Sequence, residues 1–134
     1  MRDNATMRFL YHPDQRDITL PGVLYALGDP VRLEIVRLLA EKGEQCCADF
    51  DFVISREGAA PRTIAKSTMS NHFKILRESG VVFTRKEGTQ HINKLRRQDL
   101  EGLFPGLLEA VLSSAKPLAT SQGELTKQAA SSFG

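Results

Sequence analysis

The chain has 134 residues, of which 18 are Lys or Arg, 16 are Asp or Glu and 41% are apolar. This length and apolar content suit one globular domain with a modest core, which a shared dimer interface would enlarge. The formal net charge of +2 indicates no partner by itself. We find no internal repeat, no apolar run long enough to span a membrane and no signal peptide at Met1-Arg2-Asp3-Asn4, so a cytoplasmic protein without a membrane partner is expected.

Residues 1–18 are polar and are expected to form an N-terminal arm ahead of a main domain over residues 19–115. The first clear element of that domain is a scaffold helix. Asp29 is a strong N-cap, and Pro30 suits the first helical position, where a missing amide costs nothing. Apolar residues then recur at helical spacing: Val31, Ile35, Leu38 and Leu39.

A second helix is predicted between Ser67, a good N-cap, and Gly80, a typical left-handed stop. Its two faces differ in chemistry. One face is apolar and is expected to pack: Met69, Phe73 and Leu76. The other is polar: Ser67, Ser70, Asn71, Lys74 and Glu78.

The polar face of this helix suits a DNA major groove. Short Ser and Asn side chains let a helix approach closely, Asn71 can bond an adenine edge twice, and Lys74 can reach guanine or phosphate. Thr68 is expected to contact a phosphate or a thymine methyl group. The alternative is an ordinary solvated surface helix.

A basic hairpin is predicted directly after the helix, turning at Glu87-Gly88. Arg85 and Lys86 then lie near the tip, with Thr89 and Gln90 opposite. Such a tip can reach phosphates or the minor groove, although basic hairpin tips also serve solubility. Charge distribution favours the DNA interpretation: residues 56–97 hold ten Lys or Arg against three Asp or Glu, a balance of +7, while the remainder carries −5.

The end of the domain is predicted to be a helix over residues 99–115 whose apolar stripe is too wide for one neighbour. A dimer seam is the natural use for that excess, although Pro105-Gly106 interrupts the pattern. Residues 116–134 are rich in Ser, Thr, Ala and Gln and are expected to form a flexible tail.

Three of these segments together resemble the arsenic-repressor (ArsR/SmtB) family of bacterial winged helix-turn-helix regulators. They are Ala26 to Ile35, the helix from Ser67 to Gly80 with its Asn71-His72-Phe73-Lys74-Ile75-Leu76 centre, and the wing Arg85-Lys86-Glu87-Gly88. The resemblance covers about residues 20–112.

This resemblance implies a mainly α fold with a small β-hairpin wing (α+β) and a helical dimer interface. It also implies a homodimer that presents two recognition helices to a pseudo-palindromic operator, and a repressor that an effector releases. The residues expected to contact double-stranded DNA are Lys66, Ser67, Thr68, Ser70, Asn71, Lys74, Arg85, Lys86 and Gln90.

Residues 50–67 depart from the family pattern. The short turn expected before the recognition helix is replaced by a longer segment, residues 55–66, in which Gly58 and Pro61 disfavour helix. Its basic residues either extend the contact with the DNA backbone or belong to a tolerated surface loop. The family's positioning helix is expected near residues 48–54.

Cys46 and Cys47 are the candidate effector-sensing residues. The resemblance to the family implies that Cys46 matches the first thiolate ligand of its metal sensors. Ala48 stands where those sensors have their second thiolate ligand. Soft thiolates favour soft metals, yet two adjacent cysteines are too few for a closed site, so no cofactor is required and a metal or metalloid remains one alternative. The others are thiol-based redox or electrophile sensing, and reduced core residues.

An enzyme is not expected, because the sequence contains no phosphate-binding loop, metalloprotease motif or nucleophile with a neighbouring base. The second functional class is a winged-helix protein-interaction module without DNA binding. It differs from a repressor in predicting little salt dependence of any nucleic-acid affinity.

Overall fold

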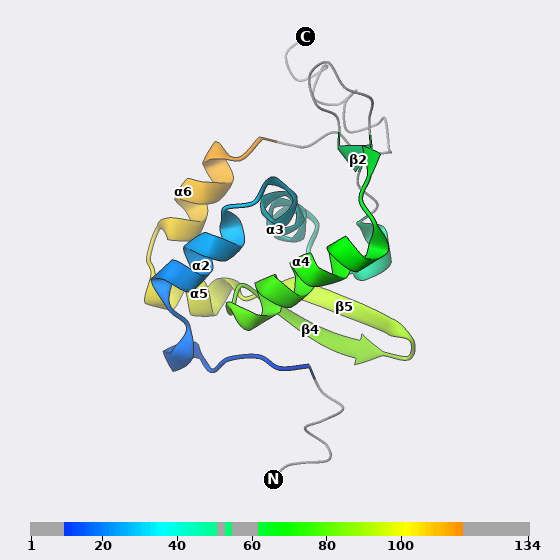
Figure 1. The fold of residues 1–134 in the computed structure, drawn as a ribbon. Coiled ribbons are helices and arrows are strands. Elements are labelled where there is room, and N and C mark those ends of the chain that lie inside the picture. Colours follow the sequence, from blue (N-terminus) through cyan, green and yellow to red (C-terminus); the bar gives the residue numbers. More distant parts are fainter. Residues whose placement is uncertain (1–9, 51–52, 55–61, 117–134) are drawn as a thin grey trace.

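A computed structural model describes residues 10–50, 53–54 and 62–116 (Figure 1). A short 3-10 helix, η1 (Gln15–Asp17), leads to the scaffold helices α2 (Leu20–Leu27) and α3 (Pro30–Lys42). The predicted start of α3 is confirmed: the Asp29 carboxylate accepts hydrogen bonds from the backbone amides of Val31 and Arg32 at 2.8 and 3.1 Å. These bonds satisfy two of the amides that the first turn leaves unpaired.

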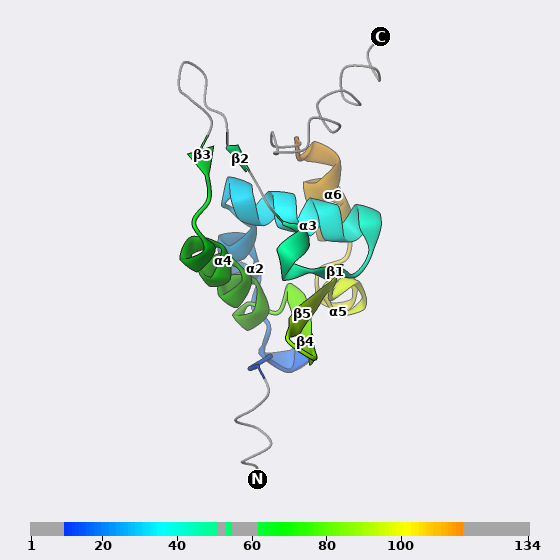
Figure 2. The ribbon, with the colours of Figure 1, turned by 90° about the vertical axis from the view of Figure 1, so that its right-hand side faces the viewer.

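The sheet has three antiparallel strands in the order β1 (Gln45–Cys46), β5 (Gln90–Leu95) and β4 (Val82–Glu87). Strands β4 and β5 form the predicted hairpin, in which Glu87 pairs with Gln90 and Val82 with Leu95. A separate two-stranded ribbon joins β2 (Val53–Ile54) to β3 (Arg62–Thr63). Both views place this ribbon above helix α4 (Lys66–Glu78) and the β4–β5 hairpin below it (Figures 1 and 2).

The expected positioning helix near residues 48–54 is wrong. The chain instead forms a single 3-10 turn, η2 (Cys47–Asp49), followed by β2. The Asp49 carboxylate accepts a hydrogen bond from the Cys46 amide at 3.0 Å, and Phe50 is buried, so the turn ends where its aromatic ring enters the core. In the longer segment, residues 62–63 are a strand, and residues 55–61 lie outside the described residues.

The single helix expected over residues 99–115 is likewise corrected to two, α5 (Arg97–Leu103) and α6 (Leu107–Ser114). Pro105 and Gly106 separate them, and Gly106 has a φ of +84°, which ends a right-handed helix. The chain therefore turns between α5 and α6 instead of offering one long apolar stripe.

The described core forms where α2, α3 and α4 meet the sheet. Its fully buried apolar side chains are Val23, Ala26, Ile35, Val36, Leu76, Val81, Val82 and Leu100. Ile18, which was expected in the N-terminal arm, also belongs to this core. Among the described helices, none has both the length and the apolar character needed to cross a membrane.

Candidate nucleic-acid interface

Helix α4 has the two faces that the sequence predicts. Phe73 and Leu76 are buried, and Phe73 meets Phe50 edge to face with ring centroids 5.4 Å apart. On the opposite face every predicted contact residue is exposed: Lys66, Ser67, Thr68, Ser70, Asn71 and Lys74. Packing therefore fixes the helix from one side and leaves its short polar side chains available on the other.

The predicted N-cap of this helix is wrong. Helix α4 begins at Lys66 with Ala65 as the N-cap, and the Met69 amide donates to the Ala65 carbonyl at 3.0 Å. Ser67 is therefore the second residue of the helix, because the backbone leaving β3 is extended only as far as Ala65. The cap side chain contributes no hydrogen bond, so the first amides of the helix keep the positive partial charge that attracts phosphate.

The predicted end of α4 is confirmed. Gly80 has a φ of +89°, its amide donates to the Arg77 carbonyl, and the Val81 amide donates to the Leu76 carbonyl, each at 3.1 Å. This pair of bonds is a Schellman motif. Because Val81 is buried, the motif fixes the direction in which the chain leaves α4 for the wing.

A cluster around Arg32 orients α4 against the scaffold. The buried Arg32 guanidinium donates to the carbonyls of Ala26 and Tyr25 at 2.7 and 3.0 Å, and its Nη1 lies 3.3 Å from His72 Nδ1 on α4. The Asp29 carboxylate lies 3.9 Å from the same ring nitrogen. Burial lowers the pKa of His72, and Asp29 partly offsets that effect.

The wing differs from α4 in how it holds its positive charge, because one of its basic residues is in ion pairs. At its tip Gly88 has a φ of +64°, and Lys86 and Gln90 are exposed as predicted. Arg85, however, is held in two ion pairs, with Glu44 at 2.9 Å and with Glu87 at 2.8 Å. These carboxylates, Glu44 first, raise the pKa of Arg85, and the bond to Arg85 lowers the pKa of Glu44. A phosphate would therefore have to compete for Arg85.

Asn93 ties the base of the wing to the cysteine segment. It is fully buried, its Oδ1 accepts from the Thr84 hydroxyl at 2.6 Å, and its Nδ2 donates to the Cys47 sulfur at 3.2 Å and to the Gln45 carbonyl at 3.3 Å. Burial raises the pKa of the Cys47 thiol, and this bond partly offsets the rise. The thiol is therefore in contact with the strand that forms the wing.

The two cysteines are both half-buried, Cys46 on β1 and Cys47 at the start of η2. Within residues 10–50, 53–54 and 62–116, no three His, Cys, Asp or Glu side chains come together as metal ligands. One chain's described residues thus do not fit a closed metal or metalloid centre. A pocket of about 610 Å³ opens beside the cysteines, between η2, α4 and the tip of the wing.

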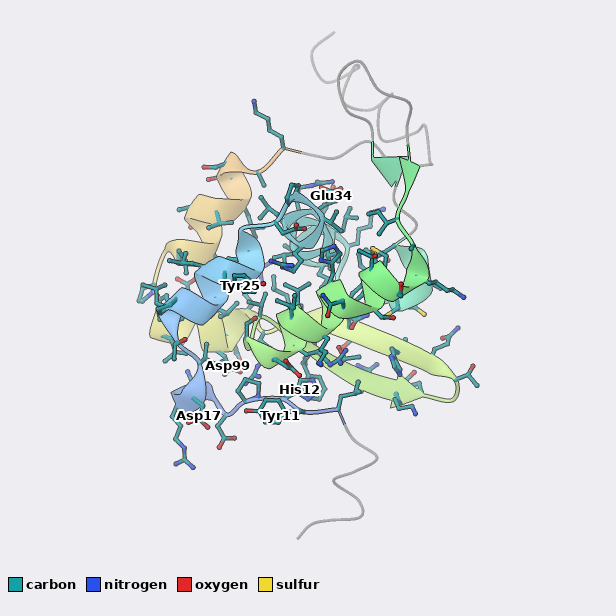
Figure 3. The ribbon with its side chains drawn as sticks, viewed as in Figure 1. Tyr11, His12, Asp17, Tyr25, Glu34 and Asp99 are labelled. Carbon is teal, nitrogen blue, oxygen red and sulfur yellow. The ribbon has the colours of Figure 1, made fainter. Side chains whose placement is uncertain are left out.

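Sequence reasoning missed three residues that position this interface, His12, Arg32 and Asn93, and a fourth, Arg77, that lines the pocket. His12 Nε2 accepts a hydrogen bond from the Thr84 amide at 3.0 Å, and its ring stacks on Phe83 at 4.4 Å (Figure 3). Arg77 follows Phe73 by four residues, so helical spacing alone places it at the edge of the packed face. The contact between His12 and Thr84 joins residues 72 positions apart, so no local sequence pattern predicts it.

Comparison with known proteins finds helix-turn-helix domains and regulators. A family profile described as a helix-turn-helix domain matches residues 27–85, which run from the end of α2 into β4. An uncharacterized HTH-type transcriptional regulator, YceK of Bacillus subtilis, is 34% identical over 89 residues, covering 66% of this chain and 82% of the relative. The fold and these relatives thus define a DNA-binding transcriptional regulator of the winged helix-turn-helix class.

The family follows from a further relative, an arsenical resistance repressor. The arsenical resistance operon repressor of Staphylococcus xylosus is 35% identical over 86 residues, 61% of this chain and 70% of the repressor. An uncharacterized HTH-type transcriptional regulator of Methanocaldococcus jannaschii is 43% identical over 68 residues, half of this chain and 66% of the relative's length. The chain belongs to the ArsR-type family of winged helix-turn-helix transcriptional regulators.

Proposed function

We propose that this regulator is a homodimeric repressor, which binds a pseudo-palindromic operator and leaves it when an effector binds. The observation that best supports the proposal is the outer face of α4, whose predicted contact residues are all exposed beside the wing. A helix of this kind enters a major groove with its first turns. In a dimer, two such helices read two half-sites one helical turn apart.

The surface on α2 supports the homodimer. Leu20, Leu24 and Tyr25 are 41%, 48% and 66% exposed, although they are large and apolar. On α6, Leu107, Val111 and Leu112 are only partly buried. Helices α2 and α6 lie on the left of Figure 1, away from the tip of the wing. Pairing through them would leave both recognition helices free for DNA.

The operator is tested by selecting DNA from a random duplex library with the full-length chain. We expect an enriched inverted repeat, and an affinity for it that falls steeply with salt as several phosphates are contacted. Failure to enrich any sequence, together with a flat salt dependence, would instead support a protein-interaction module.

The dimer is tested by light scattering of the full-length chain, whose single-chain mass is 14.9 kDa. We expect twice that mass for the wild type and a loss of dimer in Leu24→Asp, which places a charge on the exposed face of α2. Tyr11→Asp is the matched control, because Tyr11 is 62% exposed but lies on the arm. A monomeric wild type would contradict the proposal.

Cys46 and Cys47 are the proposed sensing residues, since Cys47 is bonded to the wing strand through Asn93. We expect arsenite or N-ethylmaleimide to release selected DNA from the wild type but not from a Cys46→Ser, Cys47→Ser double variant. Release of both proteins to the same extent would show that these thiols do not mediate the response.

A further inference from the structure

The pocket of about 610 Å³ beside the cysteines has walls from three parts of the chain. The cysteine segment contributes Cys46, Cys47 and Phe50, and the wing tip contributes Gln90 and His91. The third wall is the inner edge of α4, with Met69, Phe73 and Arg77. A pocket of this volume matches the size range of small-molecule sites, which combine apolar walls with a few polar groups.

The charges around this pocket are one-sided. Lys66 and Arg77 line it, whereas no Asp or Glu is among the described residues of its wall. A cavity lined by cations alone attracts an anion, because the surrounding protein screens charge less than water does.

Among the described residues of this wall, Arg77 carries a buried polar atom that lacks a partner. Its Nε is buried and has no hydrogen-bond acceptor among the described residues, and its guanidinium forms no ion pair there. Burial lowers the pKa of Arg77, and Cys47 and Glu78 offset the effect only in part. A buried donor without an acceptor costs free energy, which an anionic ligand would recover.

We propose that this pocket is the effector site and that it binds a small organic anion, a carboxylate on an apolar or aromatic body. Arg77 is the counter-cation, and Phe50, Met69 and Phe73 enclose the body of the ligand. This inference rests on the proposed function, because it assigns to the repressor a ligand class besides the thiol reagents proposed for Cys46 and Cys47 in the same wall.

Occupancy of the pocket opposes DNA binding through shared residues. Lys66, Ser70 and Gln90 line the pocket and are also predicted DNA contacts. A carboxylate held there adds negative charge beneath the surface that faces the phosphates. By linkage, the ligand lowers the affinity for DNA by the same factor by which DNA lowers the affinity for the ligand.

The test is an amide NMR titration of the full-length chain with benzoate, 1-naphthoate and 4-phenylbutanoate, each paired with its neutral amide. We expect saturable shifts at Cys47, Phe73 and Gln90 for at least one acid, and binding of its amide at least about tenfold weaker, since charge-assisted bonds are the stronger ones. Equal binding of acid and amide, shifts away from these residues, or no saturable binding would overturn the proposal.

Variants of Arg77 assign the charge. Arg77→Gln is expected to bind the acid no better than the amide, Arg77→Lys to retain part of the preference, and the control Arg97→Gln, an exposed arginine outside the pocket, to retain all of it. An unchanged preference in Arg77→Gln would overturn the role of Arg77. If Arg77→Gln does not fold, the role of Arg77 is judged from two measurements: the acid–amide affinity ratio of Arg77→Lys and that of the wild type.

The two proposals fail in different ways. With DNA from the selection experiment, the ratio of affinities without and with the bound acid is expected to exceed about tenfold for the wild type and to fall towards one in Arg77→Gln. Acid binding in the pocket that leaves DNA affinity unchanged would overturn the effector role alone. Failure of the selection itself would overturn the repressor and leave the acid–amide result standing.

Discussion

Helix α4 and the wing both contribute positive charge to the interface, but the two regions hold that charge in different ways. Lys66 and Lys74 on α4 are exposed and form no ion pair with any described residue. Arg85 in the wing is bound by Glu44 and Glu87. If these regions contact DNA as proposed, α4 can do so without losing an ion pair, whereas Arg85 of the wing would have to exchange its internal partners for a phosphate.

This difference has a structural origin. Helix α4 packs through its opposite face, so the lysines on its outer face meet no carboxylate among the described residues. The β4–β5 hairpin is joined to β1 through β5, which brings Glu44, next to β1, within reach of Arg85. The same connection carries the contact between Asn93 and Cys47, so the wing is linked to the cysteine segment by a hydrogen bond, whereas α4 meets that segment through the packing of Phe73 on Phe50.

The largest effect is expected where the two regions join, at Gly80. An added Cβ would lie 2.4 Å from Cγ1 of buried Ile18, and the φ of +89° disfavours any other residue. We expect Gly80→Ala to lower the free energy of unfolding by about 2–5 kcal/mol, from backbone strain and overpacking together. Urea denaturation measures this change.

Gly88→Ala is the matched control for Gly80. Its φ of +64° imposes similar backbone strain, but nothing lies within 4 Å of the added Cβ. We therefore expect a loss of only about 1–2 kcal/mol. Equal losses for the two variants would show that contact with Ile18 does not fix the junction.

The next largest effect concerns the helix. Asn71→Ala removes the side chain expected to bond a base edge, and we predict an operator affinity about tenfold to a hundredfold lower at unchanged stability. Lys116→Ala, an exposed lysine after α6, is the control and is expected to bind normally. Gel shifts on the selected operator measure both. An unaltered affinity in Asn71→Ala would remove Asn71 from the contact surface.

How far the sequence predicts this molecule depends on the range of the interactions involved. Asp29, Gly80 and Gly88 act within a few residues, and the start of α3, the end of α4 and the turn of the wing follow from them. Likewise, 3.6-residue periodicity identifies both faces of α4, because packing against one core imposes that period.

Contacts between distant segments escape such reasoning. The turn at η2 replaces the expected helix because Phe50 packs on Phe73. Arg85 is paired because the fold brings it to Glu44, which lies 41 positions earlier in the chain. A count of charges treats Arg77, Arg85 and Lys74 as equivalent, whereas the structure half-buries Arg77, pairs Arg85 with two carboxylates and exposes Lys74. Burial and pairing are tertiary properties, and composition cannot supply them.

A smaller effect is expected from releasing the wing's arginine. Glu44→Gln removes one partner of Arg85 and one negative charge near the phosphates, so we predict an operator affinity about two- to fivefold higher at low salt. Glu41→Gln is the control, because Glu41 pairs with Arg37 on α3. A lower affinity in Glu44→Gln would mean that the ion pair holds Arg85 in its binding position.

The smallest effect concerns pH and depends on two histidines, His12 of the arm, which contacts the wing, and His72 of α4. Burial, then Arg96 and Arg77, lower the pKa of His12, whose neutral ring accepts the Thr84 amide. The unfolded chain takes up the proton first, near pH 6.5, so the folded state loses stability as pH falls below that value. His72 on α4 acts in the same direction.

We expect His12→Gln to reduce, without abolishing, the loss of stability between pH 7.5 and 5.5 in urea denaturation, and His91→Gln, on β5 outside this contact, to keep the wild-type slope. A wild-type slope in His12→Gln would show that the arm does not hold the wing through this ring.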